Sequence, residues 1–259
     1  MSFLRTDSLR REFGGAIAVA DVDFGVEKGS ITGLIGPNGA GKTTLFNNIT
    51  GMDTPTEGCV FFKGQDITSL PAWKITRRGI ARTFQNIRLF GEMTVLENVM
   101  IGRHFQGVSP SCKRFRVLCA AAEMVALKAE EKKILEASMK WLEFFHLTGD
   151  ADSLAKNLPY GKQRHLEIAR ALATEPELLF LDEPAAGMNA QETAELIGMI
   201  RTIRDSGVTI VLIEHDMKLV MSVCDRISVL NYGRLIAEGT PAEIQNNADV
   251  IEAYLGKSE

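Results

Sequence analysis

A stretch near the N-terminus carries residue types that bind phosphate. It lies between an apolar run at 31–35 and a mixed segment at 45–49, so it is expected to form the turn of a strand–turn–helix unit. The stretch consists of Gly36, Pro37, Asn38, Gly39, Ala40, Gly41, Lys42, Thr43 and Thr44. It satisfies the pattern G-x-x-x-x-G-K-[ST], which predicts a phosphate-binding loop.

The chemistry of each residue type in this loop suits a nucleoside triphosphate. Glycines allow backbone conformations that bring N–H groups close to phosphate oxygens, and the helix that follows points its positive end at the same anion. Lys42 supplies a point charge for the β- and γ-phosphates, and Thr43 offers a hydroxyl to Mg²⁺. The alternative is a glycine-rich turn with an incidental lysine. It does not account for a strand before the loop and a helix after it.

Two carboxylates follow a second apolar run, at 178–181. If that strand neighbours the strand at 31–35, Asp182 and Glu183 lie beside the phosphate-binding loop. Asp182 can then hold Mg²⁺ through water, and Glu183 can polarise a water for in-line attack on the γ-phosphate. The alternative, a solvated acidic turn, is disfavoured by four consecutive residues of buried type.

Bulk composition limits the classes of function. The chain has 259 residues and a net charge of −4, which argues against a nucleic-acid-binding protein. No apolar run approaches the roughly 18 residues of a membrane span, and residues 1–5 do not begin a signal peptide. We therefore expect no direct membrane insertion, so any membrane association must come through a partner.

Cysteine spacing gives no sign of a disulfide framework or a zinc site. The cysteines form no CxxC pair, and they are Cys59, Cys112, Cys119 and Cys224. We interpret them as reduced thiols of a cytosolic protein, some of them simply part of the core.

Strand and helix patterns alternate in both halves of the chain, which predicts an α/β protein with a mostly parallel sheet. Alternating stretches at 2–12, 22–26 and 59–62 predict an antiparallel patch, with the first of them as an edge strand. From about 94 to 157 only helical patterns occur, opened by a capping box at Thr94. This part is expected to be an inserted helical lobe.

The expected domain organisation has four parts. An N-terminal portion of the ATP-binding core with the antiparallel patch is followed by the helical subdomain, the C-terminal portion of the core and a helical tail. Their predicted bounds are 1–88, 89–157, 158–239 and 240–259. A basic segment at 106–116 is interpreted as a loop, with a solvated face favoured over a binding site.

Further motifs occur in a fixed order along the chain. They are Phe13, Gln85 within 83–86, the segment 158–164, the loop 185–189, and His215 within 213–216. Together with the phosphate-binding loop and the two carboxylates, they make the chain resemble the nucleotide-binding subunit of an ATP-binding-cassette (ABC) transporter along essentially its whole length. The resemblance implies a P-loop NTPase fold with a RecA-like core, an antiparallel β subdomain and an inserted all-helical subdomain.

The sequence around these motifs indicates a subfamily. The segments 82–90, 160–161, 166–170 and 183–189 are similar to those of cassettes from branched-chain amino-acid importers. This similarity rests on local sequence rather than on chemistry.

The resemblance also implies a role for each motif residue. Residues 36–44 bind the ATP phosphates, and Phe13 stacks on adenine. Thr43 and Gln85 reach Mg²⁺, with Asp182 acting on the ion through water. Glu183 is the general base. His215 contacts the γ-phosphate and holds base and water in place, the alternative being a histidine that caps a helix. The remaining histidines are interpreted as structural or surface residues, and they are His104, His146 and His165.

The chain departs from the family pattern at its signature segment. Pro159 stands where the family usually has serine, and it has neither hydroxyl nor N–H to offer the phosphate held by a partner cassette. The N–H groups of Tyr160 and Gly161 could still meet that phosphate, and Lys162 adds positive charge. We hypothesise a weakened half-site and pairing with a different cassette.

The resemblance thus implies an ATPase that powers solute uptake from the cytoplasmic face of the cell inner membrane. Its implied partners are transmembrane permease subunits and a second ABC ATPase subunit, identical or different. Branched-chain amino acids are the favoured cargo. Urea or amides, and lipid or lipopolysaccharide export, remain open. So does a non-transport cassette, although the chain lacks a second cassette and a coiled-coil insertion. A P-loop kinase would need neither the signature nor His215.

Overall fold

The computed structural model describes residues 2–107 and 120–255, and the side chains of 2–103 and 130–254 within them. Contacts divide the chain into two compact units. The core unit comprises Met1–Gln85 and Glu177–Glu259, and the helical unit comprises Asn86–Pro176. The sequence placed the second boundary at 157, whereas the compact helical unit continues to Pro176 and includes the helix that follows Pro159.

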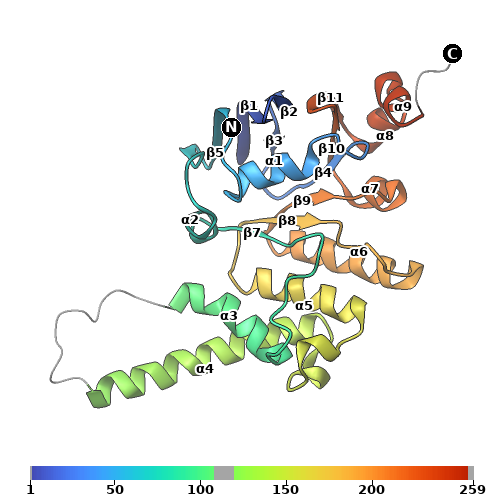
Figure 1. Ribbon diagram of the computed structural model, residues 1–259. Coiled ribbons are helices and arrows are strands. Elements are labelled where there is room, and N and C mark those ends of the chain that lie inside the picture. Colours follow the sequence, from blue (N-terminus) through green and yellow to red (C-terminus); the bar gives the residue numbers. More distant parts are fainter. Residues whose placement is uncertain (1, 108–119, 256–259) are drawn as a thin grey trace. The chain divides into compact units, whose positions relative to one another are not determined.

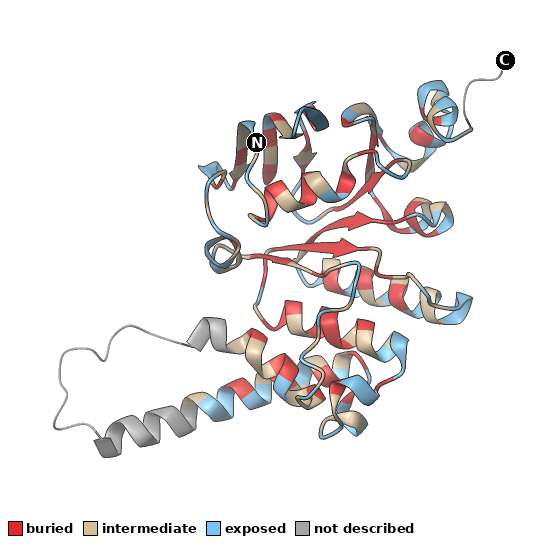
Figure 2. Cartoon of the chain, viewed as in Figure 1, coloured by how far each residue is buried: buried red, intermediate tan, exposed pale blue. Residues whose placement is uncertain are grey.

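A six-stranded sheet forms the centre of the core unit. Its strand order is β11-β10-β4-β9-β8-β7, and all neighbouring pairs are parallel except β10 with β11 (Figure 1). The strands are β4 (Ile31–Ile35), β7 (Ile80–Arg82), β8 (Leu178–Asp182), β9 (Thr209–Ile213), β10 (Arg226–Asn231) and β11 (Arg234–Gly239). Every residue of β4, β8 and β9 is buried, as expected for parallel strands covered on both faces (Figure 2). The predicted mostly parallel sheet is confirmed.

One detail of this sheet differs from the sequence prediction. Strand β8 does not neighbour β4, because β9 lies between them. Parallel strands nevertheless end at the same edge of a sheet, so the loops after β4, β8 and β9 emerge together. The carboxylates after β8 can therefore still reach the loop after β4.

An antiparallel sheet forms the second layer of the core unit. Its order is β2-β1-β5-β6, with β3 also pairing with β1. The strands are β1 (Leu4–Phe13), β2 (Ala16–Val22), β3 (Gly25–Val26), β5 (Glu57–Phe62) and β6 (Gln65–Asp66). The predicted antiparallel patch is confirmed, but the prediction of an edge strand at 2–12 is wrong. Along one edge, the first residues of β1 pair with β3 and its later residues pair with β2. Along the other edge, β1 pairs with β5.

The predicted strand at 22–26 is interrupted, because β2 ends at Val22 and β3 begins at Gly25. The buried hydroxyl of Thr6 satisfies the backbone at this break. It donates to the Val22 carbonyl (2.7 Å) and accepts from the Phe24 N–H (2.8 Å). The side chain thus replaces hydrogen bonds that a continuous strand would have made.

Helix α1 (Lys42–Ile49) lies between the two sheets (Figure 1). Its Phe46 ring meets Phe180 of β8 edge to face, with centroids 4.7 Å apart and both rings fully buried. Burying one such ring contributes about 2–3 kcal/mol. One apolar cluster therefore joins both sheets through the helix that follows the phosphate-binding loop.

Side chains cap the N-termini of several other helices of the core unit. Asn189 and Glu192 form a capping box for α6 (Ala190–Asp205), and Asp216 caps α7 (Met217–Val223). The remaining helices are α2 (Ala72–Arg77), α8 (Pro241–Gln245) and α9 (Ala248–Leu255). Because Asp216 accepts the N–H groups at the start of α7, His215 does not serve as that cap.

The described residues of the helical unit form α3 (Val95–Gly107), α4 (Ala120–Phe144), α5 (Tyr160–Leu172) and two short 3₁₀ turns, Thr148–Asp150 and Ala155–Asn157. No strand occurs in its described residues, 86–107 and 120–176. The capping box at Thr94 is confirmed, since Thr94 N donates to Glu97 (2.7 Å) and Glu97 N donates to Thr94 (3.2 Å). The predicted loop at 106–116 lies outside the described residues, except that 106 and 107 end α3.

Gly36 provides a test of how tightly β4 and β10 frame the loop. Its φ is +151°, and an added Cβ would lie 2.0 Å from the Leu230 carbonyl oxygen. Gly36→Ala should therefore lower the melting temperature of the nucleotide-free protein by roughly 2–10 °C. Gly198→Ala is the matched control, because Gly198 lies in α6 with nothing within 4 Å of an added Cβ. It should raise the melting temperature by roughly 1–4 °C. Equal effects in calorimetry would contradict this account.

Candidate active site

The predicted phosphate-binding loop connects β4 to α1 in a curled conformation. Gly36, Gly39 and Gly41 have φ values of +151°, +79° and +102°, which favour glycine. The Lys42 ammonium donates to the carbonyls of Gly36 (2.7 Å) and Pro37 (3.0 Å) and so holds the curl. No side chain caps α1, so its first N–H groups are directed at the hollow in front of the loop.

The backbone of distant segments braces this loop. Gly233, in the β10–β11 turn, donates to the Ala40 carbonyl (2.9 Å), and its own carbonyl accepts from Ala20 (2.8 Å). The Ala18 carbonyl would lie 2.3 Å from a Cβ placed on Gly41. The sequence patterns did not indicate that Gly233 contacts this loop. Backbone contacts of this kind leave no signal in residue types.

Two predicted residues from separate parts of the chain, Gln85 and His215, contact the predicted base Glu183. Gln85 Nε2 donates to Glu183 Oε2 (3.0 Å), and His215 Nε2 lies 2.6 Å from Glu183 Oε1. Each carboxylate oxygen thus has its own partner. The Glu183 side chain is 15% exposed, while His215 is 47% exposed and reaches the solvent edge.

The backbone at Glu183 is held in an uncommon conformation. Its φ is +48°, in the left-handed region that glutamate rarely adopts, and its N–H donates to the Ile213 carbonyl of β9 (2.9 Å). Such strain costs on the order of 1–3 kcal/mol and clusters at functional sites. Here the conformation places the carboxylate, at the end of β8, between Gln85 and His215.

Asp182 has a partner that sequence reasoning missed. Its Oδ2 lies 2.9 Å from Arg82 NH2, and the two side chains are 3% and 7% exposed. The signal available was a charged residue in an apolar run at 80–84, since a buried charge requires a partner. Strand β7 covers the first part of that run and ends at Arg82.

A hollow of about 270 Å³ lies in front of the loop, within the core unit. It is lined by Ala18, Asn38, Gly39, Ala40, Gly41, Lys42, Thr43, Thr44, Gln85, Glu183 and His215. All but Ala18 were predicted as site residues. Glycine backbone, a lysine and hydroxyls on one side, with a carboxylate opposite, suit a polyphosphate and an attacking water.

The donor set also fits Mg²⁺. Thr43 and Gln85 line the hollow with oxygen-bearing side chains, and Asp182 directly precedes Glu183. Within the described part of the chain, no three His, Cys, Asp or Glu side chains gather as a metal cage.

Burial shifts the pKa of two charged groups around the hollow. It lowers the pKa of Lys42, and the nearby carboxylates of Glu183 and Asp182 oppose the shift. Burial raises the pKa of Glu214, although its carboxylate accepts the N–H groups of Ala185 (2.8 Å) and His215 (3.1 Å). Glu214 therefore fastens the segment after Glu183 to the loop that carries His215, a link that sequence reasoning did not identify.

Phe13 and the signature segment do not line this hollow. Phe13 ends β1 with 48% of its surface exposed, and the Arg11 guanidinium lies 4.4 Å from its ring centroid. In the helical unit, Pro159 is the N-cap of α5 and Tyr160 is exposed. Lys162 forms an ion pair with Asp150 (2.7 Å) rather than standing as an unpaired charge.

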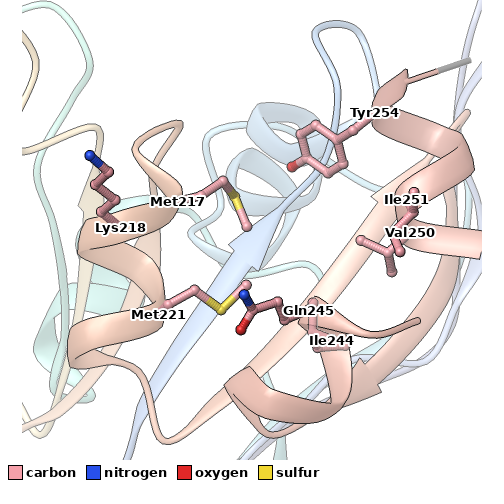
Figure 3. Close-up of a pocket in the computed structure, with 8 residues that line it drawn as sticks. All are labelled: Met217, Lys218, Met221, Ile244, Gln245, Val250, Ile251 and Tyr254. Atoms are coloured by element: carbon pink, nitrogen blue, oxygen red, sulfur yellow. The ribbon is translucent and has the colours of Figure 1, made fainter. Parts of the chain in front are cut away.

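A second, apolar pocket lies at α7, α8 and α9 and has different chemistry (Figure 3). Its volume is about 430 Å³, and its lining residues are Met217, Lys218, Met221, Ile244, Gln245, Val250, Ile251 and Tyr254. Met217, Met221 and the Tyr254 ring face its interior, while the Lys218 ammonium points away. Its lining is mostly apolar and its one ammonium points away from the interior, so the smaller polar hollow is the candidate active site.

Among the residues that the structure describes, no helix combines the length and apolar character needed to cross a bilayer.

Comparison with known proteins identifies relatives of the chain. A family model described as "ABC transporter" matches residues 19–186, and one described as "Branched-chain amino acid ATP-binding cassette transporter" matches residues 234–259. The chain is 46% identical to the high-affinity branched-chain amino acid transport ATP-binding protein BraF of Pseudomonas aeruginosa. It is 45% identical to LivG, described in the same terms, of Escherichia coli strain K12. Each alignment covers 98% of both chains.

Solved structures show the same architecture. A nucleotide-free ATP-binding cassette from an ABC transporter matches with a TM-score of 0.84 and 34% identity, over 99% of this chain and all of the other. The ADP conformation of an ATP-binding cassette matches with a TM-score of 0.83 at the same identity. The predicted P-loop NTPase fold, with its mostly parallel sheet, antiparallel β subdomain and helical insertion, is confirmed. The chain belongs to the ABC transporter family and is one of its ATP-hydrolysing, nucleotide-binding cassettes.

Proposed function

We propose that this chain is the ATPase subunit of an importer for branched-chain amino acids. It acts at the cytoplasmic face of the cell inner membrane and is attached there through permease subunits. The observation that carries the ATPase role is Glu183, held between Gln85 and His215 at the mouth of the phosphate-binding loop. The cargo is inferred from the family match at 234–259 and from the relatives BraF and LivG.

In the proposed reaction, Glu183 is the general base. Its carboxylate accepts a proton from the water that attacks the γ-phosphate in line. Lys42 and the N–H groups of the loop bind the β- and γ-phosphates and stabilise the charge that develops on them. Mg²⁺, when bound, neutralises phosphate charge, and Thr43, Gln85 and Asp182 are the residues that would hold it.

His215 and Gln85 fix the base from opposite sides. Because each bonds a different oxygen of Glu183, the carboxylate cannot rotate freely about its last bond. His215 is exposed enough to reach the γ-phosphate as well. Gln85 is the last residue of the core unit and adjoins the helical unit in sequence, so it can relate phosphate state to the orientation of that unit.

We further propose that the functional dimer pairs this chain with a different cassette. The signature position is occupied by Pro159, which has no hydroxyl and no N–H, and Lys162 is already paired with Asp150. The turn therefore offers the N–H groups of Tyr160 and Gly161 as its main phosphate donors. A partner with a fuller signature would complete the site that this chain holds.

Glu183→Gln tests the assigned base. The amide keeps the shape of the side chain but cannot accept the proton, so steady-state ATP hydrolysis should fall at least ~100-fold. ATP affinity, measured by equilibrium binding, should stay within about threefold of wild type. Glu195→Gln, on the exposed face of α6, is the control and should leave both quantities unchanged. Wild-type turnover in Glu183→Gln would refute the assignment.

His215→Ala tests the proposed orientation of the base. Loss of the contact to Glu183 should lower kcat roughly 100-fold while ATP affinity changes little, because the phosphate-binding loop is untouched. Lys218→Ala, three residues further on and exposed, should behave as wild type in the same assay. A variant that raised KM and left kcat intact would assign His215 to substrate binding instead.

Purification from native membranes tests partners and pairing together. A tagged copy of this chain should co-purify with hydrophobic permease subunits and a second, different cassette in equal amount. Mass spectrometry of the complex gives the stoichiometry. Two copies of this chain and no second cassette type would refute the mixed pair, and recovery without any membrane protein would contradict the transport role. Uptake of leucine, isoleucine and valine by vesicles holding the complex tests the cargo.

A further inference from the structure

Arg82 is a buried cation that joins three parts of the core unit. From the end of β7, its NH2 lies 2.9 Å from Asp182 Oδ2. Its NH1 donates to Asn47 Oδ1 (2.6 Å) and to Thr50 Oγ1 (3.2 Å). Asn47 belongs to α1, and Thr50 is the C-cap of that helix. One guanidinium therefore links the end of β8 to the helix that begins with the phosphate-binding lysine.

The surroundings of Arg82 favour a fixed side chain. The guanidinium carbon lies 5.6 Å from the centroid of Phe46 and 5.2 Å from that of Phe84, within the range of cation–π attraction. A buried ion pair is stable only when its geometry is good and its other polar atoms are bonded. The planar fork of arginine bonds three oxygens at once here, whereas the single ammonium of a lysine would not reach all three.

The elements that Arg82 connects are those that carry the proposed Mg²⁺ ligands. Helix α1 carries Thr43 in its first turn, β8 ends at Asp182, and Gln85 follows Arg82 by three residues. One side chain that lines no part of the hollow itself therefore bonds residues of both α1 and β8.

The backbone and the side chain of Asp182 are positioned by consecutive residues. The Asp182 N–H donates to Thr83 Oγ1 (3.2 Å), and Thr83 N donates to the Phe180 carbonyl (2.9 Å). These bonds fix the end of β8 against the residue that follows β7, but they do not involve the carboxylate of Asp182. The carboxylate itself is bonded by Arg82.

We propose that Arg82 is a positioning residue that holds the Asp182 carboxylate in place for Mg²⁺. The inference rests on the proposed ATPase function and adds a residue that does not contact the nucleotide. Partners of this kind orient metal-binding groups, and their loss typically weakens metal affinity about 10–100-fold. A merely structural Arg82 would affect stability without changing how much Mg²⁺ improves ATP binding.

ATP affinity is measured twice for each variant, once with Mg²⁺ and once with EDTA in place of Mg²⁺. The magnesium gain is the affinity with Mg²⁺ divided by the affinity with EDTA. In Arg82→Met, the magnesium gain should fall about 10-fold or more, while affinity in EDTA stays within about threefold of wild type. The melting temperature should also drop, by roughly 6–15 °C, because Asp182 is left buried without its partner. Asp182→Asn defines the gain that remains when the carboxylate is absent.

Two further variants complete the test. Arg82→Lys keeps the charge but not the fork, so it should fold better than Arg82→Met and still lose about 3–10-fold of the magnesium gain. Arg5→Met is the matched control, since Arg5 pairs with Asp7 at 2.9 Å but both side chains are exposed. It should change neither the gain nor the melting temperature appreciably.

The outcomes are separable. A wild-type magnesium gain in Arg82→Lys, or in folded Arg82→Met, would overturn the positioning role while leaving the proposed function standing. A wild-type chain that binds ATP no better with Mg²⁺ than with EDTA would overturn the proposed magnesium site, and the role of Arg82 with it.

Discussion

The candidate active site depends on the shared carboxyl edge of three buried parallel strands. Strands β4, β9 and β8 are adjacent and entirely buried, so their directions and spacing are fixed by the core. The loops that leave this edge carry the phosphate-binding glycines, His215 and Glu183. Because the strands cannot slide without exposing apolar residues, residues far apart in sequence are held within hydrogen-bonding distance. The strained backbone of Glu183 and the positive φ of Gly36 are sustained by the same buried frame.

Charge balance is the second constraint on the site. Lys42, Arg82, Asp182 and Glu183 place cations and carboxylates near each other in a partly buried region, where an unpaired charge would be costly. Each carboxylate has its own set of partners, Arg82 for Asp182, and Gln85 with His215 for Glu183. The two neighbouring acids can therefore take different roles, one toward the metal ion and one toward water.

Much of this arrangement could be predicted from sequence because it is encoded locally. The loop at 36–44 and the carboxylates after 178–181 each stand in a short stretch whose residue types indicate their chemistry. Gln85 and His215 were predicted from the resemblance of their short motifs to those of the family. What could not be predicted depends on contacts between distant segments. The central position of β1, the place of β9 between β4 and β8, and the Arg82–Asp182 pair all arise from tertiary pairing. The extent of the helical unit also follows from packing rather than from pattern.

The central claim is that Glu183 activates water, while His215 and Gln85 hold the Glu183 carboxylate in place. The most direct measurement is a high-resolution structure of the chain with Mg²⁺ and a non-hydrolysable ATP analogue, paired with its partner cassette. The account predicts a water within about 2.6–3.2 Å of a Glu183 carboxylate oxygen and in line with the γ-phosphate bond, with His215 in contact with that phosphate. A Glu183 side chain directed away from the γ-phosphate, with the attacking water held by other residues, would contradict it.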